Sequence, residues 1–177
     1  MKQPKRIAIF GRPGSGKSRF AHQLSIQTGL PCYHLDKIFF GDNWVERPQS
    51  EFVDDQKKWI RKDKWIIDGN SFRTLEMRYA QADLCIYFEL PFWLCAYRIF
   101  KRLFMRDKAI QDRARNCPEK VSLKLLWYCL TIRKRAVPKI LHLQKQYPDV
   151  ELFEICSDGQ KKMILDLLTK RLSKHQL

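Results

Sequence analysis

Residues 11–18 read Gly-Arg-Pro-Gly-Ser-Gly-Lys-Ser and match the pattern G-x-x-x-x-G-K-[ST] at every fixed position. The apolar run from Arg6 to Phe10 precedes them, and a helical pattern from Lys17 to Thr28 follows. Glycines let the backbone curl so that successive N–H groups point inward, and the N-terminus of the next helix adds partial positive charge. The sequence therefore predicts a phosphate-binding loop between a buried strand and a helix.

Different residues of the loop are expected to bind phosphate and Mg²⁺. Lys17 is expected to reach the β- and γ-phosphates of a bound nucleotide, and the Ser18 hydroxyl to hold Mg²⁺. The remaining loop residues would bind phosphate mainly through the backbone. The predicted nucleotide-binding set is Gly11, Arg12, Pro13, Gly14, Ser15, Gly16, Lys17 and Ser18. An ordinary glycine-rich turn is the alternative interpretation.

Four more apolar runs, at 32–35, 65–67, 84–90 and 150–155, alternate with helical patterns. This alternation predicts an α/β fold with a parallel sheet covered by helices on both faces. A chain of 177 residues without a linker or repeat predicts a single domain over 1–177. Ligands of such sheets bind beyond the carboxyl ends of the strands, where the sequence places residues 11–18, Asp36 and residues 68–73.

Two aspartates at strand ends are candidates for the chemistry. Asp68 could reach Mg²⁺ through water, or form an Asx turn with Gly69. Asp36 could orient or deprotonate an acceptor hydroxyl, or cap the next segment. His34 and Cys32 share a strand face with Asp36, so a metal site there is a weaker alternative.

The charge is strongly biased. The chain has 34 Lys and Arg against 19 Asp and Glu, a net charge of +15, which favours an anionic partner. Residues 98–135 hold twelve basic against three acidic residues. We expect a basic helical insertion over about 98–147, with an apolar helical run at 121–132 bracketed by prolines 118 and 138. Arg98 and Arg102, four residues apart on one helix, would neutralise charge that develops on transferred phosphate, or lie on a solvated face.

The aromatic and sulfur residues divide into surface and core candidates. Trp44, in a polar loop beside Arg47, is a candidate to stack on a base or sugar. Four other tryptophans, at 59, 65, 93 and 127, occupy apolar periodic positions and are expected in the core. The six cysteines lie in or beside apolar segments without a C-x-x-C pair, so buried free thiols are expected. With no signal-peptide core at the start and no apolar span, we expect a cytoplasmic protein without a membrane partner.

Several motifs in order resemble the DNA topology modulation proteins, which are bacterial P-loop proteins related to adenylate and shikimate kinases. The motifs are the phosphate-binding loop, His-Leu-Asp at 34–36, Asn-Trp-Val-Glu-Arg-Pro at 43–48, Trp-Ile-Ile-Asp-Gly-Asn at 65–70, Leu-Pro at 90–91, Asn-Cys-Pro-Glu at 116–119 and Arg-Lys-Arg at 133–135. The resemblance covers nearly the whole chain.

The resemblance implies a five-stranded parallel sheet in the order 2-3-1-4-5, with ATP on the loop. It implies that Asp68 serves the metal and that Arg73 binds a phosphate of the acceptor. Arg98 and Arg102 match the R-x-x-x-R that begins the lid in the kinases, where the first arginine stacks on adenine. Asp36 lies where related small-molecule kinases hold the acceptor, which would also contact Trp44 and Arg47. The relatives imply a monomer.

Two functions remain open from the sequence. The leading hypothesis is an ATP- and Mg²⁺-dependent phosphotransferase, in which Lys17, Asp36, Arg98 and Arg102 act on a small nucleotide-like or phosphorylated acceptor. The alternative is a nucleotide-switched regulator that binds nucleic acid through its basic segment and affects DNA topology. A GTPase is disfavoured because no N-K-x-D motif follows the fourth strand.

Overall fold

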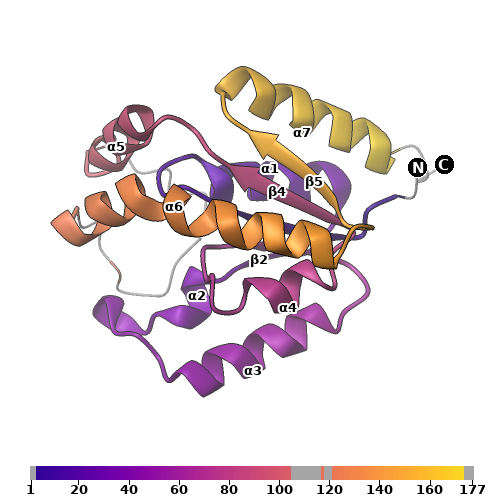
Figure 1. Ribbon diagram of the computed structural model, residues 1–177, viewed down its shortest axis with the longest axis horizontal. Helices are drawn as coiled ribbons and strands as arrows, with labels where there is room; N and C mark the ends of the chain where they lie inside the picture. Colours follow the sequence, from indigo (N-terminus) through magenta and orange to yellow (C-terminus); the bar gives the residue numbers. More distant parts are fainter. Residues whose placement is uncertain (1–2, 105–116, 118–120, 174–177) are drawn as a thin grey trace.

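The computed structural model describes residues 3–104, 117 and 121–173. Its centre is a five-stranded, fully parallel sheet in the order β2-β3-β1-β4-β5 (Figure 1), which confirms the predicted fold. The strands are β1 (Arg6–Gly11), β2 (Cys32–His34), β3 (Trp65–Asp68), β4 (Leu84–Phe88) and β5 (Glu151–Ile155). All five lie where apolar runs predict strands, with ends that differ by at most two residues.

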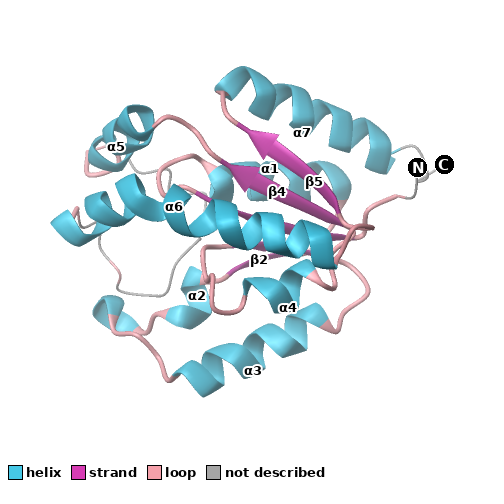
Figure 2. Cartoon of the chain, viewed as in Figure 1, coloured by secondary structure: helices cyan, strands magenta, loops and turns pink. Residues whose placement is uncertain are grey.

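Helices cover both faces of the sheet, as Figure 2 shows. They are α1 (Lys17–Thr28), α2 (Asp36–Phe39), α3 (Gln49–Ile60), α4 (Leu75–Tyr79), α5 (Phe92–Lys101), α6 (Leu123–Gln146) and α7 (Asp158–Ser173), with a short 3₁₀ turn η1 (Asp42–Trp44). The central strand β1 shows why two layers form. Its Ile7 and Ile9 belong to one apolar cluster and Ala8 and Phe10 to the other, because alternate side chains point to opposite faces.

The two clusters assign the helices to their faces. The cluster that contains Ile9 also contains Phe20 of α1 and Leu168 of α7, and these two helices contact each other. The cluster that contains Phe10 includes Phe52 of α3 and Ile140 of α6. Parallel strands direct their carboxyl ends to one edge, so β1, β2 and β3 bring residues 11–18, 34–36 and 68–70 together there.

Helix α6 corrects the expected role of Pro138. The sequence predicts a helical run that stops before this proline, but α6 continues through it to Gln146. Proline in a helix removes one hydrogen bond, to the carbonyl four residues earlier. Pro138 is exposed, and the buried positions Ile132, Ala136 and Ile140 stay in helical register on either side of it. Packing against the sheet therefore outweighs the missing bond.

Two expected core tryptophans lie outside the core. Trp65 is fully buried and Trp59 is half-buried, but Trp93 is 80% exposed and Trp127 is 67% exposed. Helix α5 has apolar residues on more than one side, and the side that packs inward contains Cys95 and Ile99. Periodicity located an apolar face correctly but could not tell which of two faces is covered.

Four of the six cysteines are buried as predicted, whereas Cys32 is half-buried and Cys156 is exposed. All six are free thiols, and Cys156 is exposed because it follows the end of β5 at the sheet edge. Among the described helices, none is long and apolar enough to cross a membrane. Part of the predicted basic insertion, residues 105–116 and 118–120, lies outside the described residues.

Candidate functional site

The loop at 11–18 has the backbone that its glycines predict. Gly11, Gly14 and Gly16 have φ values of 132°, 75° and 89°. A Cβ atom on Gly14 would lie 2.5 Å from the backbone oxygen of Cys95. Glycine is therefore required there both by the left-handed backbone and by the close approach of α5. The loop leads directly into α1, whose first residue is Lys17.

Lys17 is enclosed by the loop. Its ammonium donates a hydrogen bond to the backbone oxygen of Arg12 over 2.9 Å, and its side chain is buried. Burial lowers the pKa of Lys17, while the negative charges of Asp68 and Asp36 act in the opposite direction. Arg102 adds to the lowering, so the charge of this arginine acts on the loop. The structure thus places a cation at the centre of a curled backbone.

Asp68 lies beside this cation at the end of β3, and only 4% of it is exposed. Its Oδ2 atom is 3.0 Å from Nδ1 of His34. Burial raises the pKa of Asp68, but the hydrogen bond and charge of His34, the charge of Lys17 and the Ser18 hydroxyl lower it overall. Its Oδ1 atom is buried and has no hydrogen-bond partner among the described residues.

These oxygen atoms fit Mg²⁺. Mg²⁺ prefers oxygen ligands and keeps several waters, so a hydroxyl and a carboxylate oxygen near a phosphate-binding loop suit it. Ser18 and Asp68 are the pair that the sequence predicts for this role, which stays a prediction. The weaker alternative of a metal site at Cys32, His34 and Asp36 has no support. Nε2 of His34 contacts Sγ of Cys32 at 3.7 Å, and no group of three His, Cys, Asp or Glu side chains suited to a metal occurs within the described part of the chain.

The side chain of Arg12 is engaged with other parts of the protein. It is buried, forms an ion pair with Glu89 beyond β4, and donates a hydrogen bond to the backbone oxygen of Cys129 in α6. Glu89 also accepts a hydrogen bond from Tyr87. Only the backbone of Arg12 is thus in position to serve the loop. The long-range pair with Glu89 has no signal in the sequence.

Arg98 lies on the helix that touches the loop, and Arg102 follows the last residue of that helix. Arg98 is one turn beyond Cys95, and it forms an ion pair with Asp158 over 2.5 Å. Lys161 also pairs with Asp158. Arg98 is therefore held at the N-terminus of α7, at the side of the loop where α1 begins. Sequence reasoning missed both Asp158 and Lys161.

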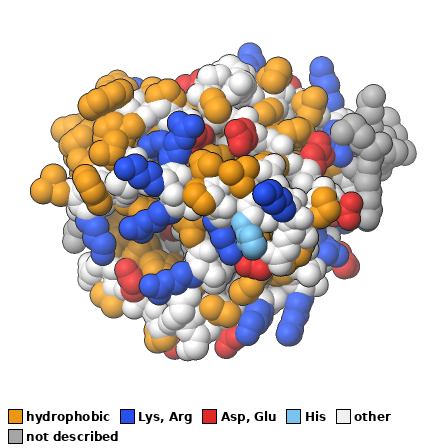
Figure 3. Space-filling view, in the orientation of Figure 1, with side chains coloured by type: hydrophobic (Ala, Val, Ile, Leu, Met, Phe, Trp, Pro, Cys, Tyr) orange, Lys and Arg blue, Asp and Glu red, His pale blue; other side chains and the backbone are white. Residues whose placement is uncertain are grey.

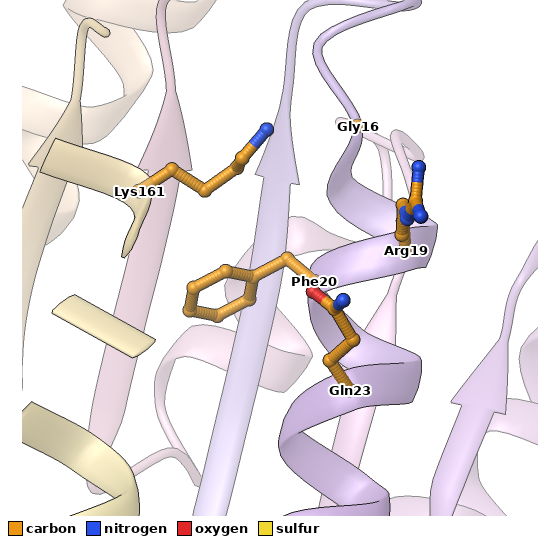
Figure 4. Close-up of a pocket in the computed structure, with 5 residues that line it drawn as sticks. All are labelled: Gly16, Arg19, Phe20, Gln23 and Lys161. Atoms are coloured by element: carbon orange, nitrogen blue, oxygen red, sulfur yellow. The ribbon is translucent and has the colours of Figure 1, made fainter. Parts of the chain in front are cut away.

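A cavity of about 220 Å³ lies on this side of the loop, between α1 and α7 (Figure 4). It is lined by Gly16, Arg19, Phe20, Gln23 and Lys161. In Figure 4 the Lys161 side chain extends from α7 towards the start of α1, and a Cβ atom on Gly16 would lie 3.7 Å from its Nζ. The cavity thus opens next to the loop and is bordered by two cations.

The predicted acceptor-binding residues follow strands β2 and β3, next to the phosphate-binding loop. Asp36 is exposed at the start of α2 and is close enough to Lys17 and Tyr128 to affect both pKa values. Burial, with the charge of Asp36, raises the pKa of Tyr128 to about 12. Tyr128 is on α6, so that helix faces Asp36 across the edge. No sequence pattern pointed to this tyrosine.

The other three acceptor candidates have different surroundings. Trp44 is half-buried, has a φ of 64°, and packs edge-on against Phe40. Arg47 is engaged in ion pairs with Glu51 and Asp55 of α3. Arg73 is exposed in the turn between β3 and α4. Trp44 and Arg47 thus have protein partners, and the role of all three residues towards an acceptor stays a prediction.

A residue that the sequence did not single out joins the loop to β3. Oδ1 of Asn70 accepts a hydrogen bond from the backbone N–H of Gly11 over 2.8 Å. Arg78 fixes the turn around Asn70, because its guanidinium donates to the backbone oxygen of Ser71 over 3.2 Å and approaches that of Gly69 at 3.5 Å. Arg78 is fully buried, and burial lowers its pKa to about 10.

Comparisons with known proteins show the fold. No protein-family model matches the chain, and no curated protein matches it by sequence. A shikimate kinase from Acinetobacter baumannii in complex with shikimate aligns over 98% of this chain and 96% of its own, with a TM-score of 0.59 and 15% identity. A gluconokinase from Sinorhizobium meliloti 1021 aligns over 98% and 94%, with a TM-score of 0.57 and 12% identity.

A second shikimate kinase, from Aquifex aeolicus vf5, aligns over 94% of this chain and 95% of its own, with a TM-score of 0.50 and 14% identity. Likenesses at such low identity concern the fold alone. The chain therefore has the fold of the P-loop kinases that act on small molecules, over nearly its whole length.

Proposed function

We propose that the protein is an ATP-dependent phosphotransferase that moves the γ-phosphoryl group of ATP to a hydroxyl or phosphate of a small acceptor. The observation that carries the proposal is the buried Lys17 inside the curled loop, with the unpartnered Oδ1 atom of Asp68 beside it. The order of motifs along the chain further supports membership of the DNA topology modulation proteins, related to the P-loop kinases.

Each residue has a defined task in this proposal. The loop N–H groups and Lys17 bind the β- and γ-phosphates, and Ser18 with Asp68 holds Mg²⁺, which neutralises phosphate charge when bound. Arg98 and Arg102, at the end of the helix in contact with Gly14, stabilise negative charge as the γ-phosphoryl group leaves the β-phosphate. Their action requires no proton transfer.

The acceptor would bind beside the phosphate-binding loop, at the residues that follow strands β2 and β3. Asp36 orients its hydroxyl for in-line attack, so that the new P–O bond forms opposite the bond that breaks. Arg47, Arg73 and Trp44 are proposed to contact the rest of the acceptor, nucleotide-like or phosphorylated. Closure of the lid that begins at Arg98 would exclude water, so little ATP hydrolysis is expected without acceptor.

A transfer assay with γ-labelled ATP and Mg²⁺ tests the proposal. Nucleosides, nucleoside monophosphates, shikimate, gluconate and other hydroxylated metabolites would be offered in turn. Label on one acceptor, lost by about 100-fold or more in Lys17→Ala, is the expected result. Lys58→Ala is the matched control, because Lys58 is an exposed lysine that pairs with Asp55 on α3, away from the loop.

The alternative function predicts another result in the same experiment. A nucleotide-switched regulator would bind ATP but transfer no label to any acceptor, and it would retain DNA in a salt-dependent way. That combination would replace the kinase proposal. ATP binding that survives unchanged in Lys17→Ala would contradict both readings of the loop.

A further inference from the structure

Large apolar side chains are exposed together on α5 and on the first half of α6. Helix α5 exposes three such residues at spacings of four and three, the turn after it exposes two more, and α6 exposes three at spacings of four and three, so each helical set lies on one helix face. We call this surface the aromatic ridge. It consists of Trp93, Tyr97, Phe100, Leu103, Phe104, Leu123, Trp127 and Leu130.

The ridge forms one surface of the molecule. The helices α5 and α6 pack against each other, and Figure 1 shows α5 beside the N-terminal half of α6 at one end of the sheet. Figure 3 shows apolar side chains gathered over that end, with basic side chains beside them. Phe104 and Leu123 are each 86% exposed, so they project from the surface.

Other exposed apolar residues do not form such a group. Ile26, Val45 and Leu141 come from three separate elements or loops, and Met163 and Leu167 form only a pair, four residues apart on α7. Single exposed apolar side chains are normal on soluble proteins, whereas a contiguous apolar patch marks an interaction surface. The ridge is thus the candidate interaction surface among the described residues.

The charge beside the ridge has one sign. Helices α5 and α6 contain no aspartate or glutamate along their whole lengths. Exposed Lys101 and Lys124 lie next to ridge residues, and Nζ of Lys101 is 6.0 Å from the centre of the Tyr97 ring. Arg133, Lys134 and Arg135 follow on α6 and are exposed. A partner must therefore accept apolar side chains and carry negative charge.

We propose that the aromatic ridge binds the surface of an anionic lipid bilayer. Exposed tryptophan, phenylalanine and leucine with lysine and arginine beside them are the residue types that bind at a bilayer interface. The apolar side chains would insert at the headgroup level, and Lys101 and Lys124 would meet the lipid phosphates. The sheet edge that carries Lys17 and Asp68 would then lie beside the membrane surface.

Two other partners fit the same surface less well. A second copy of this chain would bring basic helices without carboxylates face to face. Single-stranded nucleic acid stacks on aromatic rings, but Leu103, Leu123 and Leu130 offer no ring, and Leu123 is one of the two most exposed large apolar residues described. A bilayer accommodates aliphatic and aromatic side chains alike.

Vesicle co-sedimentation tests the proposal with the full-length protein. Vesicles of phosphatidylglycerol and phosphatidylcholine would be compared with vesicles of phosphatidylcholine alone, at about 0.05 M and about 0.5 M salt. We expect binding to the anionic vesicles that weakens with salt. The double substitution Trp93→Ser and Trp127→Ser should reduce binding by about tenfold or more, because it removes two side chains that insert.

Matched controls separate the ridge from general stickiness and from misfolding. The double substitution Ile26→Ser and Met163→Ser removes two comparably exposed apolar residues elsewhere, and it should leave vesicle binding unchanged. Both double variants should keep the wild-type melting temperature, since the residues are exposed. Intrinsic tryptophan fluorescence should shift to the blue on anionic vesicles in wild type and not in the Trp93→Ser, Trp127→Ser variant.

Other outcomes would overturn the proposal. Equal sedimentation of wild type and the ridge variant would remove the ridge from membrane binding. Absence of vesicle binding with ridge-dependent retention of a single-stranded oligonucleotide would assign the surface to nucleic acid. Ridge-dependent dimerisation in analytical ultracentrifugation, without vesicle binding, would assign it to a second copy. None of these outcomes depends on phosphoryl transfer, because the labelled-ATP assay tests the proposed function separately.

Discussion

The Nδ1 atom of His34 lies 3.0 Å from the Oδ2 atom of Asp68, and the two residues occupy paired positions at the ends of β2 and β3. Burial lowers the pKa of His34, but its bonds to Asp68 and Cys32 raise it to about 10. Because the Asp68 carboxylate can only accept, Nδ1 of His34 donates the hydrogen bond to Oδ2. That bond fixes the carboxylate and leaves Oδ1 for another ligand.

Replacing Asp68 should uncouple nucleotide binding from magnesium. In the wild type, ATP is expected to bind more tightly with Mg²⁺ than without it. Asp68→Asn should abolish most of that difference, about tenfold, because the amide oxygen lacks the charge that attracts the ion. Calorimetric titration with ATP, with and without Mg²⁺, measures it.

The control for this substitution lies at the opposite end of the same strand. Asp63 is exposed in the turn before β3, so Asp63→Asn should keep the full magnesium effect. A magnesium effect of wild-type size in Asp68→Asn would remove this carboxylate from the metal site.

Gly14→Ala should distort the phosphate-binding loop. The φ of Gly14 is 75°, and a Cβ atom would lie 2.5 Å from the Cys95 carbonyl oxygen and 2.9 Å from Cγ1 of Ile99. The strain should cost about 1–3 kcal/mol of stability or force α5 away from the loop. Thermal unfolding and ATP titration would show a lower melting temperature and weaker binding.

Gly159→Ala provides the comparison. A Cβ atom on Gly159 meets only Oγ of Ser157 at 3.9 Å, and alanine favours the helix that Gly159 helps to begin. This variant should match or slightly exceed the wild-type melting temperature. Equal effects of the two substitutions would argue against a special role for Gly14.

Arg78→Met should destabilise the fold through the turn after β3. The substitution removes donors from the side-chain oxygen of Gln56 and the backbone oxygen of Ser71, which are bonded at 3.1 and 3.2 Å. Both acceptors keep hydrogen bonds from Thr74, so each loses one of its donors and is not left unsatisfied. At about 0.5–1.5 kcal/mol for each lost hydrogen bond, a loss of about 1–3 kcal/mol is expected. Urea unfolding measures it, and Arg61→Met, at an exposed helix end, should be close to neutral. A neutral Arg78→Met would mean that the turn does not depend on this guanidinium.

The sequence predicted features that local chemistry dictates. The loop at 11–18 depends on glycines and on a lysine at fixed spacing, so its residues and the flanking strand and helix could be located directly. The buried strands were equally visible, because a parallel sheet covered on both faces requires continuous apolar runs. The strand order came from resemblance to P-loop kinases, since local patterns do not encode the order of strands in a sheet.

Side-chain pairs between residues far apart in the sequence could not be predicted from local patterns. His34 meets Asp68 only because β2 and β3 are neighbours in one particular register. Likewise, Arg12 meets Glu89 because β1 lies beside β4, and Arg98 meets Asp158 because α5 ends near the start of α7. Trp93 was misplaced for a related reason: a helix with apolar residues on two sides does not reveal which side the sheet covers.

The ion pairs of Asp158 should give the protein a stability increment that is lost in acid. The hydrogen bond from Lys161, with help from Arg98, lowers the pKa of Asp158 below 3.8. A carboxylate with a lowered pKa stabilises the fold at pH values above its unfolded pKa, and this stabilisation disappears as pH falls through its folded pKa. Wild type should therefore melt higher than Asp158→Asn above about pH 5, by about 3 °C or less because the pair is partly exposed, and the two should converge near about pH 2. Asp166→Asn, at an exposed position farther along α7, should follow wild type throughout. A gap between wild type and Asp158→Asn that persists unchanged in acid would attribute it to something other than this charge.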